Sequence, residues 1–195
     1  MSDKISFIAR FILFAGVHSL FAAVWVKKAL HGSDRPGYRL CYNCASLVLL
    51  GWVMSAYGHS DVLYVAPGVT SLIMYALQLG IIGILASCLR QTGIGEFLGF
   101  TRRTSTSFTS TGWYSMVRHP LYFFSILFMV MNPVVTAQWL ILTIMGTVYF
   151  IIGALIEEKR FTAEYGDAYR RYQQNVPFII PTLSRRVPRN TQYPG

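Results

Sequence analysis

The sequence has few charged residues for its length. Only 13% of its 195 residues are Asp, Glu, Lys or Arg, about half of the roughly 25% that is usual in a soluble domain. Apolar residues make up 53%, and the mean hydropathy is +0.43. This number of charged residues is too small to cover the surface of a soluble globular protein. The composition therefore excludes an ordinary soluble domain and predicts an integral membrane protein.

Cysteine is also scarce. Cys41, Cys44 and Cys88 are too few for a disulfide framework. The first two have the C-x-x-C spacing of zinc sites, but a structural zinc ion needs four ligands and the sequence has no second pair. We therefore expect no metal site and interpret the cysteines as small residues that pack between helices.

Acidic residues are outnumbered by basic ones, 8 against 17. In a soluble protein this excess would indicate nucleic acid binding. Here the basic residues form short blocks between apolar runs, which instead indicates contact with anionic headgroups of a lipid bilayer. We expect that partner and no nucleic acid.

Five apolar stretches predict the fold, an all-α, polytopic membrane protein with five transmembrane helices. They are residues 7–26, 40–57, 62–88, 120–133 and 138–156. Only the turn 132–138 separates the last two, which should form a helical hairpin. A cleaved signal peptide could resemble the first stretch, but its apolar run is too long for that role and four more stretches follow.

The basic residues also predict the orientation, because Lys and Arg favour the cytoplasmic side. Two of the 17, Lys4 and Arg10, lie on the side of the N-terminus. The other 15 fall on the opposite side: Lys27, Lys28, Arg35, Arg39, Arg90, Arg102, Arg103, Arg118, Lys159, Arg160, Arg170, Arg171, Arg185, Arg186 and Arg189. We predict a multi-pass protein of the cell membrane with its N-terminus outside and its C-terminus in the cytoplasm.

The segment after the fifth stretch predicts an amphipathic helix over residues 157–174, bent at Gly166. Its aromatic side chains recur at steps of three and four residues and form one face, with Phe161, Tyr165, Tyr169 and Tyr172. We expect it to lie in the cytoplasm against the membrane or the helix ends.

Residues 176–181 contain two prolines and cannot span the membrane, and residues 182–195 form a basic tail. Residues 101–111, rich in Ser and Thr, are interpreted as a linker.

Two polar clusters are hard to explain as membrane packing. Arg118 and His119 precede Pro120, Leu121 and Tyr122 at the start of the fourth stretch, where free N–H groups and the helix dipole favour an anionic ligand. Glu157 and Glu158 follow the fifth stretch, where they oppose the helix dipole and need a cationic partner.

The lengths of the two helices predict a pocket between these clusters. Residues 120–133 cover about 21 Å as a helix, against about 28 Å for residues 138–156 and a hydrocarbon core of about 30 Å. We therefore expect His119 to be recessed relative to Glu157, in a pocket with donors at its base and carboxylates at its mouth. A ligand with a carboxylate, one or two positive charges and a flat ring would suit it.

Residues 112–181 resemble the integral-membrane isoprenylcysteine carboxyl methyltransferase-like superfamily. The residues that carry this resemblance are Arg118-His119-Pro120-x-Tyr122, Glu157-Glu158, Tyr165-Gly166-x-x-Tyr169-x-x-Tyr172-x-x-x-Val176-Pro177 and Pro181. Upstream, His18-Ser19 and Leu89-Arg90-Gln91 are closer to its bacterial methanethiol S-methyltransferase and nitrite-reductase-accessory branch. One departure is Asn175, where many members carry a basic residue before the Val-Pro pair.

The resemblance implies an S-adenosylmethionine-dependent methyltransferase acting on a lipophilic or small thiol or carboxylate acceptor. It implies cofactor binding by Arg118, His119, Pro120, Leu121, Tyr122, Glu157, Glu158, Tyr169, Tyr172 and Pro177. The chain would comprise three helices and loops over 1–111, the cofactor-binding hairpin and C-terminal helix over 112–181, and the tail 182–195. Two alternatives stay open: a non-catalytic membrane accessory protein that keeps the pocket, and an NADPH enzyme of the sterol-reductase type.

Two further polar side chains lie inside apolar stretches. His18 is costly in lipid and must face a partner or a cavity. We expect it to form a hydrogen bond between helices, with substrate binding as the alternative. Gln78 should also form a hydrogen bond between helices.

Overall fold

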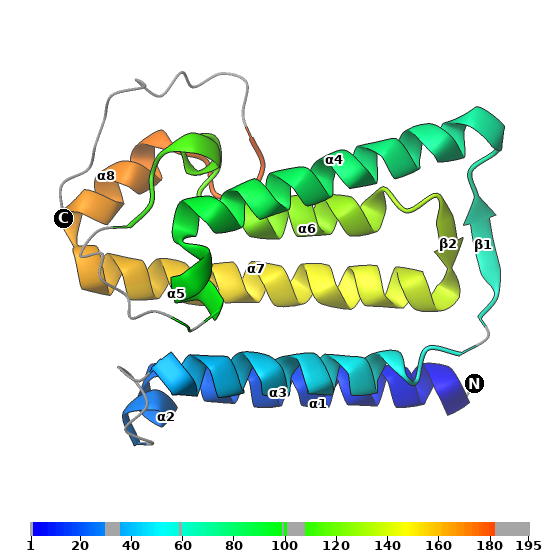
Figure 1. Ribbon diagram of the computed structural model, residues 1–195, viewed down its shortest axis with the longest axis horizontal. Coiled ribbons are helices and arrows are strands. Elements are labelled where there is room, and N and C mark those ends of the chain that lie inside the picture. The colour runs from blue at the N-terminus through cyan, green and yellow to red at the C-terminus, as the bar shows by residue number, and fades with distance from the viewer. Residues whose placement is uncertain (1, 30–35, 59, 99, 101–107, 182–195) are drawn as a thin grey trace. The chain divides into compact units, whose positions relative to one another are not determined.

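The computed structural model describes residues 2–29, 36–58, 60–98, 100 and 108–181, which are mostly helical, as predicted. The chain forms two compact units. The first consists of Met1–Leu63, Gly93–Arg103 and Thr136–Ile141, and the second of Tyr64–Thr92, Thr104–Val135 and Leu142–Gly195. Figure 1 labels the helices and strands of both.

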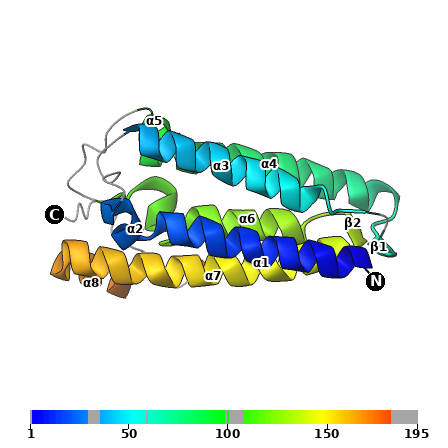
Figure 2. The ribbon, with the colours of Figure 1, turned by 90° about the horizontal axis from the view of Figure 1, so that it is seen from below.

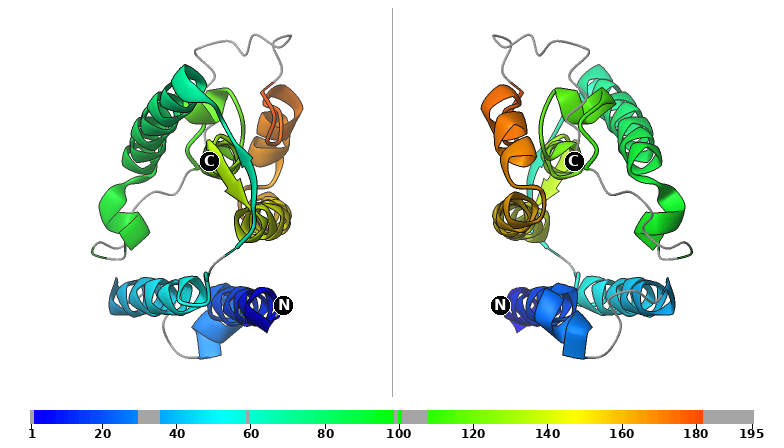
Figure 3. Two further views of the ribbon diagram at one scale, coloured as in Figure 1. Left: turned by 90° about the vertical axis from the view of Figure 1, so that its right-hand side faces the viewer. Right: turned by 90° about the vertical axis from the view of Figure 1, so that its left-hand side faces the viewer.

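The first unit is built on α1 (Ser2–Ala22) and α3 (Pro36–Met54), which lie side by side (Figure 3). It also contains the short helices α2 (Val24–Ala29) and α5 (Ile94–Leu98). The predicted first stretch, 7–26, is therefore not one helix, because it is interrupted at Ala23. The predicted hydrogen bond of His18 is confirmed, since its ring contacts Tyr42 and Ser46 of α3.

The second unit contains α4 (Gly68–Thr92), the 3-10 turn η1 (Gly112–Ser115), α6 (Pro120–Val130), most of α7 (Ala137–Tyr165) and α8 (Asp167–Asn175). Helices α4 and α6 pack along each other, and Gln78 of α4 donates a hydrogen bond of 3.0 Å to the carbonyl of Phe128, as predicted. Side chains join α6 to α7, because the ring of Tyr122 stacks on that of Phe150.

A two-stranded sheet departs from the all-α prediction. Strand β1 (Val62–Val65) pairs with β2 (Val134–Thr136). The predicted third stretch, 62–88, therefore begins as a strand and becomes helical only from Gly68, and the predicted turn 132–138 contains the other strand. Pro67 explains the first correction, because proline fixes its own backbone and disfavours helix in the residue before it.

The predicted helix over 157–174 is divided between two elements. Helix α7 continues through Glu157 and Glu158 to Tyr165, and Figure 2 shows it as one long helix. Only α8 is separate. The predicted bend at Gly166 is confirmed: this residue has φ +55° and ψ −127°, a conformation that favours glycine.

Three described helices are long and apolar enough to cross a membrane, over Asp3–Ala22, Gly68–Thr92 and Ala137–Tyr165. Their apolar side chains face outward: Leu72 and Leu79 of α4 are 67% and 71% exposed, as expected for lipid contact. Five spans are not confirmed, because α6 has only 11 residues and α3, with Arg39 and Asn43 in its first half, is not among the three.

The orientation and the three-segment division stay predictions. The basic tail 182–195 and most of the Ser/Thr-rich linker, residues 101–107, lie outside the described residues.

Candidate functional site

Glu158 of α7 is the centre of a buried polar cluster in the second unit. Its Oε1 accepts hydrogen bonds from Arg118 Nε at 3.0 Å, His119 Nε2 at 2.8 Å and Tyr169 Oη at 2.7 Å. Its Oε2 accepts one from the amide of Gln173. The side chain is only 10% exposed, and buried carboxylates are stable when cationic and hydrogen-bonding partners surround them. Three separate segments therefore meet at one carboxylate.

Arg118 connects the start of α6 to the segment after α8. Its Nη1 donates to the carbonyls of Gln173 and Val176, both at 2.8 Å, and its backbone N–H donates to the carbonyl of Pro177 at 2.9 Å. Its guanidinium lies 5.6 Å from the centre of the Phe178 ring. The planar guanidinium has five donors in a fixed arrangement, so one arginine can hold both the carboxylate and the chain end.

Local sequence explains why these groups converge. His119 is the residue before α6, and Pro120 occupies the first helical position, where its missing N–H costs nothing. Tyr169 and Gln173 are four residues apart in α8, so their side chains project from the same face. That face is turned toward α7 at Gly166.

Glu157 has different surroundings from its neighbour. Its side chain is 30% exposed, and its Oε1 accepts from Arg160 at 3.3 Å while its Oε2 accepts from the Tyr122 hydroxyl at 3.3 Å. His119 Nδ1 lies 3.7 Å from Oε2. The two adjacent acids thus divide the polar site into a buried part around Glu158 and an accessible part around Glu157.

An aromatic cluster supports the buried part. Tyr169 and Tyr172 are almost fully buried, and their rings lie 5.1 Å from the Phe108 ring. Burial, together with the hydrogen bond to the Glu158 carboxylate, raises the pKa of Tyr169. The Tyr172 hydroxyl donates to the carbonyl of Tyr114. This packing fixes α8 against the residues that precede α6.

The structure brings most of the predicted cofactor residues together. Those in or beside the polar cluster are Arg118, His119, Tyr122, Glu157, Glu158, Tyr169 and Pro177. Pro120 is buried and Leu121 half-buried at the start of α6, whereas Tyr172 lies in the aromatic cluster. His119 was expected to be recessed relative to Glu157, and its side chain is indeed the more buried of the two, 3% exposed against 30%. It also pairs directly with Glu158, which was not expected. Assignment of these residues to a cofactor stays a prediction.

Three residues of this site were missed by the sequence interpretation. Gln173 could have been found from its four-residue spacing to Tyr169. Phe108 was hidden in a segment interpreted as a linker, and its single aromatic ring among Ser and Thr was the only signal. Phe178, whose ring contacts His119 edge-on, had no distinguishing pattern. Asn175, the departure from the superfamily, donates to the carbonyl of Arg171 within α8.

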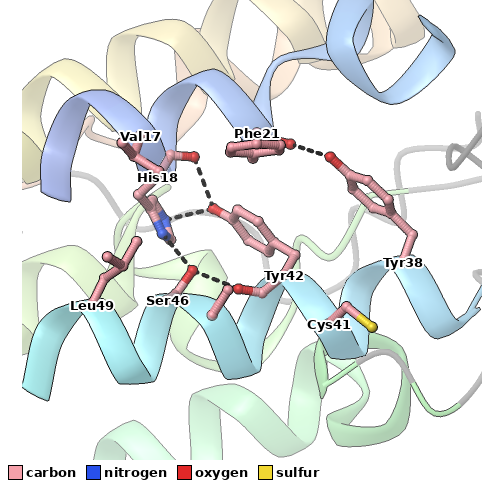
Figure 4. Close-up of a pocket in the computed structure, with 9 residues that line it drawn as sticks. Val17, His18, Phe21, Tyr38, Cys41, Tyr42, Ser46 and Leu49 are labelled. Carbon is pink, nitrogen blue, oxygen red and sulfur yellow. Dashed lines mark hydrogen bonds between the residues drawn. The ribbon is translucent and has the colours of Figure 1, made fainter. Parts of the chain in front are cut away.

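A second polar group lies in the first unit, where His18, Tyr42 and Ser46 border a cavity between α1 and α3 (Figure 4). Cys41 also lines this cavity, and Cys44 is exposed on the same helix. Among the described residues, no group of three or more His, Cys, Asp or Glu side chains could hold a metal ion.

Apolar helices long enough to cross a membrane and a buried ionic cluster at the helix ends define a helical membrane protein. Residues 6–178 match the NnrU protein family, so this chain belongs to that family. The predicted methanethiol S-methyltransferase and nitrite-reductase-accessory branch is thereby confirmed.

Several curated relatives are bacterial proteins named methanethiol S-methyltransferase. The chain is 32% identical over 83 residues to that of Crocosphaera subtropica, which covers 43% of this chain and 32% of the relative. It is 35% identical over 79 residues to that of Pseudomonas deceptionensis, covering 40% and 30%. The match therefore spans about a third of the length of these relatives. No solved structure matches the chain.

Proposed function

We propose that this protein is an integral membrane methyltransferase that uses S-adenosylmethionine and a small or lipophilic thiol or carboxylate acceptor. The observation that carries the proposal is the division of the acidic pair. Glu158 is fully engaged inside the protein, whereas Glu157 presents a half-exposed carboxylate beside Tyr122 and the start of α6. The names of the relatives support the same activity.

The accessible residues fit the cofactor in their chemistry. S-adenosylmethionine has an ammonium and a sulfonium, which the Glu157 carboxylate can attract, and a carboxylate, which suits a helix start. The first N–H groups of α6, at Leu121 and Tyr122, have no acceptor within their own helix and lie at the positive end of its dipole. When bound, the cofactor would supply an electrophilic methyl group.

The buried cluster has a supporting role in this proposal. Arg118, His119 and Tyr169 direct donors to Glu158, so we interpret these four as positioning residues. They hold the segment 173–178 against the start of α6 and orient His119 and Tyr122, whose rings stack 5.6 Å apart. Proper alignment and exclusion of water are what methyl transfer requires of a protein.

A thiol or a carboxylate suits such a site because neither needs a strong base. A carboxylate is already ionised, and a thiol of pKa about 8.5 needs only a modest positive influence to become a thiolate. The exposed apolar faces of the helices would let a lipophilic acceptor arrive through the bilayer.

The test is methyl transfer by the purified full chain in nanodiscs. We expect radiolabelled S-adenosylmethionine to label hexanethiol or a prenylcysteine analogue. Labelling of a thiol should increase as the pH rises through the thiol pKa, and labelling of a carboxylate should not. Methylation of a phospholipid amine, with none of any thiol or carboxylate, would overturn the proposed acceptor class.

Two binding measurements separate the alternatives. Calorimetric binding of S-adenosylhomocysteine without methylation of any acceptor would support the accessory protein instead. Binding of NADPH, with no binding of S-adenosylhomocysteine, would support the reductase.

A further inference from the structure

The cavity between α1 and α3 has the size of a small-molecule site. Its volume is about 240 Å³, whereas an apolar cavity of about 150 Å³ is already large enough to bind benzene. Val17, Phe21, Ala45 and Leu49 supply apolar walls, and the polar lining residues His18, Tyr38, Tyr42 and Ser46 bond to protein groups (Figure 4). A compact apolar molecule with one polar group therefore fits it.

The hydroxyl hydrogens of these polar residues are directed at protein acceptors. Ser46 Oγ donates to the carbonyl of Tyr42 at 2.7 Å. Because serine has one hydroxyl hydrogen, its contact with His18 Nδ1 at 2.9 Å must be donated by the imidazole. The neutral ring then accepts at Nε2, where the Tyr42 hydroxyl lies at 2.6 Å. These bonds form a chain in which each group polarises the next.

Tyr38 extends the same pattern. It lines the cavity, and its hydroxyl donates to the carbonyl of Phe21 at 2.8 Å. Because the Tyr38 and Tyr42 hydroxyls direct their hydrogens to acceptors on α1, their oxygens can act toward a ligand only as acceptors. Cys41 adds only a weakly donating thiol. The two tyrosine oxygens are therefore suited to a ligand that brings its own hydrogen.

We propose that this cavity binds a small apolar thiol or alcohol, with its S–H or O–H directed at a tyrosine oxygen, in preference to the corresponding methyl ether or thioether. The choice of a thiol rests on the proposed function. Methylation removes the ligand's only donor, so the cavity would hold an unmethylated acceptor and release its methylated form. The loss of one ordinary hydrogen bond corresponds to about a five-fold difference in affinity.

The two cysteines of α3 provide a matched test, because Cys41 lines the cavity and Cys44 does not. The full chain in nanodiscs, as Cys44→Ser or Cys41→Ser, is labelled with a maleimide in the presence of 1-hexanol, 1-methoxyhexane or hexane. The alcohol replaces the thiol because a thiol would consume the reagent. We expect hexanol to slow the labelling of Cys41 at about one-fifth of the concentration at which 1-methoxyhexane has the same effect. Labelling of Cys44 should not change.

A variant that fills the cavity completes the test. Ala45→Leu should abolish the protection of Cys41, whereas Val48→Leu, at an exposed position of the same helix that does not line the cavity, should keep it. Equal protection by alcohol and ether, protection of both cysteines, or protection that survives Ala45→Leu would each overturn the inference. Hexanethiol should raise the melting temperature of the unmodified chain more than hexyl methyl sulfide, and equal effects would also count against it.

The outcomes separate this inference from the proposed function. Selective protection of Cys41 in a chain that methylates nothing would leave the cavity as a ligand site and reject the methyltransferase. Methylation of hexanethiol without protection of Cys41 would keep the methyltransferase and reject this cavity as a binding site for the thiol.

Discussion

Two adjacent acids in α7 show how position decides the role of a residue. Helical rotation points Glu158 toward Arg118 and α8, and leaves Glu157 beside Tyr122 with a larger exposed fraction. The same charge is thus part of the internal packing in one residue and accessible to a ligand in the next. In the sequence, the two formed a single pair with one expected role.

Glutamine substitutions should separate these roles. Glu158→Gln removes the charge that Arg118 and His119 face, and breaking a buried pair costs about 3 kcal/mol, so its melting temperature should fall clearly. Glu157→Gln should melt like the wild type but bind S-adenosylhomocysteine about ten- to a hundredfold more weakly, because it loses a charge-assisted hydrogen bond. Calorimetry would measure both quantities.

Glu164→Gln, at an exposed position of α7, is the matched control and should change neither quantity. If Glu157→Gln bound the ligand as well as wild type, the accessible carboxylate would not be part of the cofactor site.

At the scale of elements, the turn between α7 and α8 determines whether the site forms. Gly166 has a positive φ of 55°, and no atom lies within 4 Å of where a Cβ would be. Its need for glycine is therefore a matter of backbone conformation rather than of space. The turn brings Tyr169 and Gln173 to Glu158, so the geometry of one residue positions two donors of the site.

Gly166→Ala should destabilise the protein by about 1–3 kcal/mol through backbone strain and should weaken ligand binding together with it. Gly83→Ala places a methyl group in equally open space within α4 and should not lower stability, because alanine favours helix over glycine. Thermal melts of the two variants would measure the difference. Equal melting temperatures would show that the turn tolerates a side chain.

At the scale of the whole molecule, the basic residues are distributed very unevenly. Lys4 and Arg10, the two basic residues on the side of the N-terminus, both form contacts within the first unit. Lys4 pairs with Asp61 at 3.0 Å, and Arg10 donates to the Trp52 carbonyl and the Ser55 hydroxyl. The Lys4 hydrogen bond also lowers the pKa of Asp61. Lys4 and Arg10 are therefore bound within the first unit, and the 15-to-2 distribution of Lys and Arg favours a cytoplasmic C-terminus.

Cysteine labelling in intact cells would test this orientation. After replacement of the three native cysteines by serine, a cysteine at Val62, which is 58% exposed, should react with a membrane-impermeant maleimide. A cysteine at Asn190, outside the described residues, should react only after permeabilisation. The reverse pattern would mean that the C-terminus lies outside.

The sequence alone determined the class of this protein and where most of its long helices begin, although α7 continues nine residues beyond the predicted end at residue 156. The free energy of transferring a segment from water to lipid depends on the residues of that segment alone. The composition and length of each apolar run therefore indicated helices such as α4, α6 and α7. The spacing of Arg118, His119, Glu157 and Glu158 also indicated that these residues belong to one site.

Only the tertiary structure decided which of these groups face one another. The pairing of β1 with β2, the direct contact of His119 with Glu158 and the approach of Phe108 to Tyr169 join residues far apart in the chain. Such contacts depend on side-chain packing and on the direction of each hydrogen bond, which no local pattern encodes. For the same reason the sequence could place His18 beside a partner, but not show that this partner, Tyr42, lines a cavity between α1 and α3.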